Sequence, residues 1–150
     1  MRDFLTVTLK VPDSHIRFLT DTNAKRTNII HAFRELQTDP RIKKDNPILI
    51  FFAGHGGETN APYGWYSGDV DNKIQMIIPQ DRNTNQKKPV HGIPDRTIGA
   101  LINGIAKAKG DNIARILLTP ELKLTNGKSR LSSSIAAIPA LEREKEPTMK

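Results

Sequence analysis

The 150-residue sequence contains no cysteine, and aromatic residues make up only 5% of it. The absence of cysteine excludes disulfides, thiolate metal ligands and a cysteine nucleophile supplied by this chain. It also fits a reducing compartment, so we expect a cytoplasmic protein. No apolar run approaches the ~18 residues of a membrane helix, and the first ten residues lack the apolar core of a secretory signal. We therefore expect no membrane partner.

Basic residues are in excess, and the formal net charge is +7. Such an excess can indicate nucleic acid as a partner. Here the charges are spread along the chain, and the densest run, Arg41–Lys44, is short. With so few aromatic residues there is no platform for stacking bases. We interpret the charge as a solvated basic surface, which argues against nucleic acid as a partner.

The four histidines, His15, His31, His55 and His91, lie far apart in the sequence. None forms a His-x-x-x-His pair, so no zinc site is indicated and we expect no bound metal. His31 lies off the apolar stripe of its predicted helix, which favours an ordinary surface position.

Hydrophobic periodicity predicts two amphipathic helices. The first ends before Pro40, and the second begins at Pro94–Asp95 and ends at Gly110. Their apolar stripes are Ile29, Ile30, Phe33 and Leu36, and Ile98, Leu101, Ile102 and Ile105. Strands are predicted around 16–19, 48–53, 73–78 and 113–118, and residues 59–72 read as a long surface loop. The alternation of strands and helices predicts an α/β fold.

The strongest strand candidate is the unbroken apolar run Ile48–Ala53. A strand that is apolar on both faces is typical of the centre of a parallel sheet covered by helices. The run ends abruptly at Gly54–Gly57, with His55 between glycines. Ligand sites in open α/β sheets lie at this carboxyl end of the strands. From spacing alone, the loop is either a site with a catalytic imidazole or a glycine turn with an incidental histidine. It lacks the usual phosphate-loop patterns.

The segment Ile48–Gly57 resembles the strand and histidine loop of caspase-like cysteine peptidases, especially the metacaspase-like group. Several neighbouring segments resemble the same family in the same order, and the resemblance covers about residues 1–113. These neighbours are Arg17–Asp21, Asn28–Phe33, Ile77–Asp81 and Ile93–Asp95.

This resemblance implies a three-layer α/β/α sandwich of the caspase–hemoglobinase type and a cysteine–histidine dyad that cleaves peptide bonds. It assigns His55 as the catalytic histidine and the backbone N–H of Gly56 as one oxyanion donor. It assigns no role to His91 or Asp81. It implies a peptide or protein substrate, and homo- or hetero-dimers through a sheet edge. No cofactor is expected. The resemblance leaves open a dependence on calcium, although no residues here indicate a site for it.

Two departures from the family pattern leave the expected sandwich incomplete. The family begins earlier, with a first strand that is central in its sheet. Its nucleophile follows the strand that begins here near Asp111, and an ungapped placement puts Leu118 at the family's aspartate and Pro120 at the cysteine. Proline supplies neither a nucleophile nor an N–H. The adjacent Thr119 would point to the other side of the strand and is a poor substitute.

We therefore expect a caspase-like fragment over 1–113 and a poorly ordered tail of other origin over 114–150, from splicing or a gene-model boundary. The sequence predicts a domain of the cysteine endopeptidase type that has no nucleophile and little or no activity. The alternatives are a non-catalytic caspase-like interaction module and, less favoured, a basic nucleic-acid binder.

Overall fold

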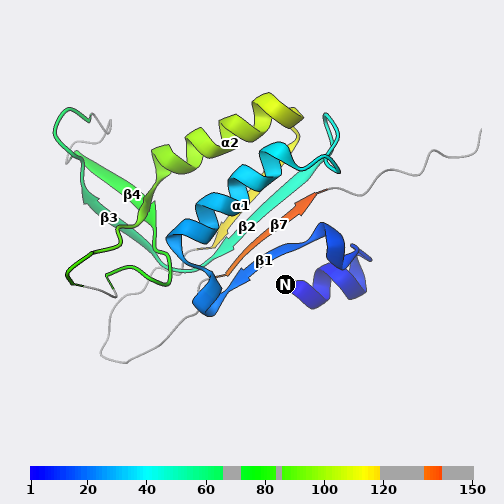
Figure 1. Cartoon of the computed structure of the whole chain (residues 1–150), viewed down its shortest axis with the longest axis horizontal. Helices are drawn as coiled ribbons and strands as arrows, with labels where there is room; N and C mark the ends of the chain where they lie inside the picture. Colours follow the sequence, from blue (N-terminus) through cyan, green and yellow to red (C-terminus); the bar gives the residue numbers. More distant parts are fainter. Residues whose placement is uncertain (66–71, 84–85, 119–133, 140–150) are drawn as a thin grey trace, which may run out of the picture.

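Within residues 1–65, 72–83, 86–118 and 134–139, which the computed structural model describes, the chain forms a mixed α/β fold with two sheets. The larger sheet carries two long helices, α1 (Arg26–Thr38) and α2 (Asp95–Lys109), side by side on one face (Figure 1). The smaller sheet lies beyond one end of these helices. The α/β class predicted from the alternation of strands and helices is confirmed.

The larger sheet has the strand order β1-β7-β2-β6. These strands are β1 (Arg17–Thr20), β2 (Ile48–Ala53), β6 (Ile113–Leu118) and β7 (Ser134–Pro139). Strand β2 pairs in parallel with β6 and antiparallel with β7, and four of its six residues are buried. The prediction of a central, buried strand over 48–53 with a parallel neighbour is confirmed.

Strand β7 lies between β1 and β2 and runs antiparallel to both. No local pattern in the sequence predicts this strand, since the segment after 118 shows no sustained period. Residues 114–118 and 134–139 of the expected tail are thus strands of the larger sheet. Residues 119–133 and 140–150 lie outside the described residues, and the division of the chain at 113 stays a prediction.

The main core lies between the larger sheet and the two helices. Alternate residues of β2 point toward the helices, and they join one cluster with the apolar stripes of α1 and α2. This cluster includes Ile29, Phe33, Leu36, Ile48, Ile50, Phe52, Ile102 and Ile105. Both helices therefore end where the sequence predicted, and their apolar stripes face the core as the spacing predicted. Gly110 ends α2 with a φ of 91°, a backbone conformation that favours glycine.

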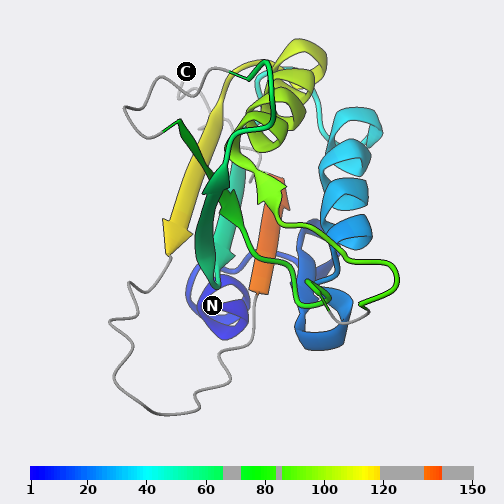
Figure 2. The ribbon, with the colours of Figure 1, turned by 90° about the vertical axis from the view of Figure 1, so that its left-hand side faces the viewer.

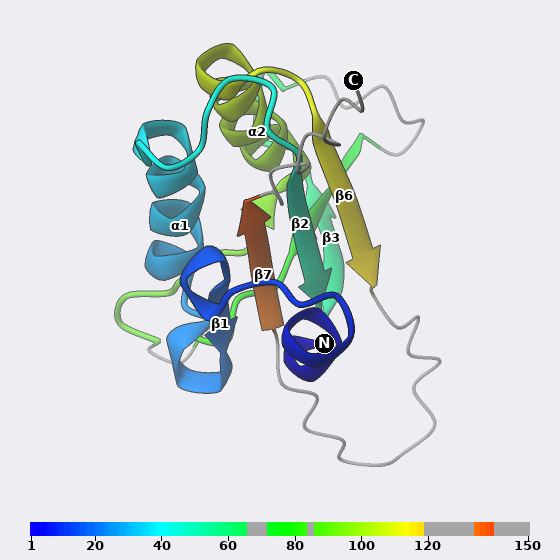
Figure 3. The same cartoon turned by 90° about the vertical axis from the view of Figure 1, so that its right-hand side faces the viewer.

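The opposite face of the larger sheet carries the short helix η1 (Phe4–Thr8). Leu5 of this helix and Val11 are buried, and Leu49 of β2 packs against them. Figures 2 and 3 show η1 on the side of the sheet away from α1. Two short 3-10 helices, η2 (Asp13–His15) and η3 (Asp21–Asn23), flank β1.

The smaller sheet has the order β3-β4-β5. Its strands are β3 (Gly56–Asn60), β4 (Lys73–Ile77) and β5 (Ile93–Pro94), and each pair is antiparallel. The expected loop over 59–72 therefore begins later, because residues 56–60 pair with β4. The polar sequence of β3 carries no apolar alternation, so only the partner strand reveals it.

A corner joins the carboxyl ends of α1 and α2. The ammonium group of Lys109 donates hydrogen bonds to the carbonyls of Asp39 and Ile42, at 2.7 and 3.0 Å. The guanidinium of Arg41 donates hydrogen bonds to the carboxylate of Asp39 from Nε and Nη2, with Nη2 2.6 Å from Oδ2. These contacts hold the chain as it turns from α1 toward β2.

We predict that Ile48→Ala costs about 2–5 kcal/mol in the free energy of unfolding, because the side chain is only 1% exposed. Ile116→Ala is the matched control on the neighbouring strand, where the side chain is 42% exposed, and should cost about 1 kcal/mol or less. Urea unfolding measures both. Equal costs would contradict the central position of β2.

The Asp39–Arg41 pair predicts a loss of stability in acid. Hydrogen bonding to the Arg41 side chain lowers the pKa of Asp39 from 3.8 to about 2. A carboxyl whose pKa is lower when folded stabilises the fold above pH 4, and this contribution disappears as the pH falls from about 4 to 2. Arg41 is 58% exposed, so solvent screening keeps this contribution small.

Urea unfolding of the native chain and of Arg41→Gln checks this prediction. The stability difference between them should shrink between pH 5 and pH 2. Arg34→Gln removes an exposed arginine from α1, and its effect should stay constant over the same range. A difference for Arg41→Gln that does not change with pH would contradict the assignment.

Candidate functional site

His55 lies at the carboxyl end of β2, in the short link to β3. Gly54 before it is buried, and the His55 side chain is half-buried. Its carbonyl accepts a hydrogen bond of 2.9 Å from the N–H of Ile78, directly after β4. The end of the central strand and the pairing with β4 therefore fix the backbone from which the imidazole projects.

The N–H of Gly56 points away from β4. Hydrogen-bonded pairs alternate with non-bonded pairs along an antiparallel ladder. The Ile78–His55 bond and the bond from Ala61 N–H to the Asn72 carbonyl, at 2.8 Å, identify the bonded pairs. Gly56 opposes Ile77 between them, at a non-bonded position. Because β3 is an edge strand, this N–H faces its open side, as an oxyanion donor beside an imidazole requires.

Gly57 brings a cation to the same loop. A Cβ atom at position 57 would lie 3.1 Å from Cδ1 of Ile78 and 3.9 Å from Nη1 of Arg82. The glycine thus lets the turn after β4 approach closely, and it sets the Arg82 guanidinium beside the histidine loop. Nothing in the local sequence marks Arg82, because its approach to this loop depends on the pairing of β3 with β4.

Asp81 holds this turn against α1. Its Oδ1 accepts a 2.9 Å hydrogen bond from the N–H of Arg26, the first residue of α1. The N–H of Gln80 donates to the carbonyl of Ala24 at 3.0 Å. Asp81, which had no assigned role from sequence, caps the helix from a distant turn. It thereby ties the neighbourhood of Arg82 to the main core.

The parallel pairing of β2 and β6 bears on the missing nucleophile. Ala53 pairs with Leu118, so the carboxyl ends of the two strands lie side by side. His55 follows Ala53 by two positions, and position 120 follows Leu118 by two. Thr119 and Pro120 themselves lie outside the described residues, and no cysteine occurs in the sequence.

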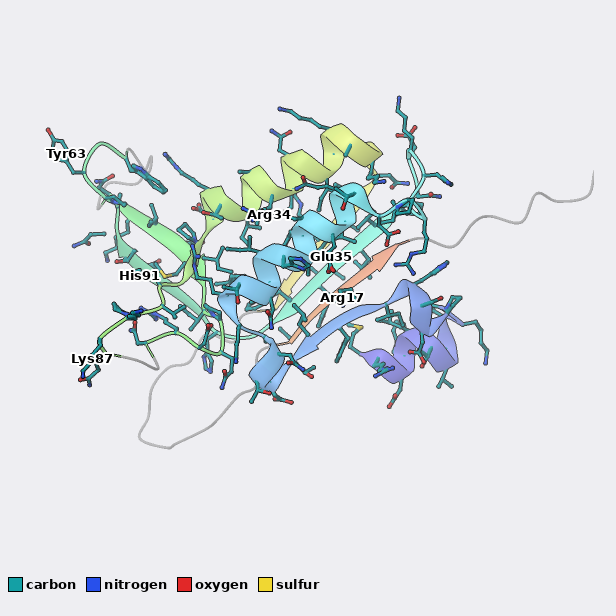
Figure 4. All side chains as sticks on the ribbon, in the orientation of Figure 1. Arg17, Arg34, Glu35, Tyr63, Lys87 and His91 are labelled. Carbon is teal, nitrogen blue, oxygen red and sulfur yellow. The ribbon has the colours of Figure 1, made fainter. Side chains whose placement is uncertain are left out.

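The remaining predicted features do not gather at this site. His91 and Lys87 are exposed in the segment before β5 (Figure 4). His31 is exposed on α1, as predicted, and its Nδ1 lies 3.4 Å from Oε1 of Glu35. Within the described parts of the chain, no three histidine, aspartate or glutamate side chains cluster as a metal site would need. In the same parts, no helix is long and apolar enough to cross a membrane.

Comparison of the chain with protein-family models, curated proteins and solved structures found no match.

We predict that Asp81→Ala lowers the free energy of unfolding by about 0.5–2 kcal/mol, the usual cost of losing a helix cap. Asp81→Asn keeps an acceptor oxygen and should retain most of the stability. Asp111→Ala, at an exposed position before β6, is the control and should change little. Urea unfolding at neutral pH measures all three. Equal effects of the two alanine variants would contradict the capping role.

Proposed function

We propose that this chain is a caspase-like domain of the cysteine endopeptidase type that lacks its nucleophile and hydrolyses no peptide bonds. The observation that carries the proposal is the position of His55 at the carboxyl end of β2, next to the parallel strand β6. A histidine and a nucleophile at the ends of two adjacent parallel strands can share a proton across a short gap.

Two further observations support it. The N–H of Gly56 points to the open side of β3, where it can stabilise a developing oxyanion. The sequence holds no cysteine, so this imidazole has no thiol partner within the chain. The incomplete caspase–hemoglobinase sandwich, with helices α1 and α2 on one face, belongs to the same proposal.

A non-catalytic interaction module is the second candidate. Its specific support is that β1 and β6 are the two edges of the larger sheet, and edge strands offer unpaired backbone groups to other chains. In this candidate the chain keeps the caspase-like fold, and its function is to bind other chains rather than to hydrolyse peptides. Both candidates predict an inactive chain, so the histidine loop is tested separately, through the reactivity of an introduced thiol.

The proposed arrangement can be tested by restoring a thiol. In Pro120→Cys the chain carries a single cysteine, and a neighbouring imidazole lowers a thiol pKa below its usual ~8.5. We expect alkylation by iodoacetamide to show a midpoint below pH 8.5, and His55→Ala in the same variant to return it to about 8.5. Asp111→Cys, at the other end of β6, is the matched control and should not respond to His55→Ala.

The native chain should hydrolyse no fluorogenic peptide ending in Arg, Lys or Asp, with or without calcium. Turnover near the ~10 s⁻¹ typical of enzymes, lost in His55→Ala, would refute the inactive reading. If His55→Ala does not change the alkylation midpoint of the thiol at position 120, the proposed arrangement of the dyad is refuted.

A further inference from the structure

The outer edge of β1 is open. Strand β1 pairs with β7 on one side, and no described residue pairs with its other side. Such an edge presents alternating N–H and C=O groups to solvent and can accept another extended chain. The groove described next lies at the amino end of β1, whereas His55 follows the carboxyl end of β2, and these two strands run parallel to each other.

A groove of about 360 Å³ lies between the start of β1 and the carboxyl half of α1. This volume is within the ~300–1,000 Å³ of sites that hold ligands. Its apolar lining includes Ile16 and the buried Leu36, and its polar lining includes Arg17, Glu35 and Arg41. An extended chain paired with β1 would direct alternate side chains into this groove, toward α1.

The charges of the groove favour a carboxylate at Arg17. Nη2 of Arg17 lies 3.1 Å from Oε2 of Glu35, and its side chain is 52% exposed (Figure 4). That ion pair engages one of its nitrogens and leaves the rest of the guanidinium fork available. Arg41, in contrast, is fully engaged with Asp39 and the carbonyl of Ser14.

The surroundings add to this preference. The exposed Lys43 and Lys44 follow Arg41, and the whole chain carries a formal net charge of +7. This field attracts acidic partners and speeds their association. Nucleic acid fits less well, because it has no peptide N–H and C=O groups that could pair along the outer edge of β1.

We propose that this groove binds an extended acidic peptide, which pairs with the outer edge of β1 and places a glutamate or aspartate carboxylate on Arg17. The partner is a protein segment with acidic residues at alternate positions. This site is independent of the histidine loop in the proposed function, since His55 does not line the groove.

The probe is an acetylated, amidated decapeptide of alternating glutamate and valine with a fluorescent label, titrated with the full chain. We expect binding with a Kd of about 10–100 µM that weakens as salt rises. Arg17→Glu should weaken binding about tenfold or more, because it replaces attraction by repulsion at the contact. Arg34→Glu makes the same charge change on α1 outside the groove and should stay within about twofold.

Two control peptides test the recognition without altering the protein. A lysine–valine peptide should not bind. The glutamate peptide is also made in two N-methylated versions, one methylated at the odd positions and one at the even positions. One of these versions should fail to bind, because it lacks the N–H donors that face β1. Circular dichroism and thermal melting confirm that each variant is folded.

The proposal is overturned if the glutamate peptide does not bind, or if Arg34→Glu weakens binding as much as Arg17→Glu. It is also overturned if both methylated peptides bind normally, which would show attraction without strand pairing. Displacement of the probe by a single-stranded decanucleotide would identify a general polyanion site instead. Probe binding that competes with self-association of the chain would identify a second copy as the occupant.

Discussion

Strand β2 bonds to a neighbour along each of its edges and packs side chains against each of its faces. Ile48, Ile50 and Phe52 face the core under α1 and α2, whereas Leu49 faces the small cluster around η1. Helix α1 and β1 are attached to the rest of the fold through this core and through β7. The position of His55 follows from the same strand, because the loop begins where the buried run ends. The end of β2 therefore sets where the candidate site lies in the fold.

The parts of the fold that were predictable from the sequence are those whose side chains repeat with a local period. Strand β2 and both helices are recognisable from an apolar run and from apolar stripes, because burial of these side chains requires that spacing. Strand β3 could not be found in this way, because it is polar and is held by pairing with β4. Strand β7 lies in a segment without a sustained apolar period, and its neighbours come from distant parts of the chain.

The same distinction holds for the candidate site. His55 and Gly56 were predictable because they end a recognisable strand. Arg82 and Asp81 were not, because a turn brings them to the histidine loop and to α1 only after the smaller sheet has formed. The sequence could also not show that the groove at β1 and the histidine loop occupy opposite ends of the larger sheet. Each could therefore change without loss of the other.

The place of β7 has a consequence for the order of events during synthesis. Ribosomes add about 5–20 residues per second, so β1 and β2 emerge several seconds before Ser134–Pro139. The pairing of Arg17 with Ala137 joins positions that lie 120 residues apart in the sequence. Until that contact forms, each of the two early strands keeps an unpaired side, and the nascent chain is exposed to chaperones and to other nascent chains. The larger sheet is thus completed only after Ser134–Pro139 has been synthesised.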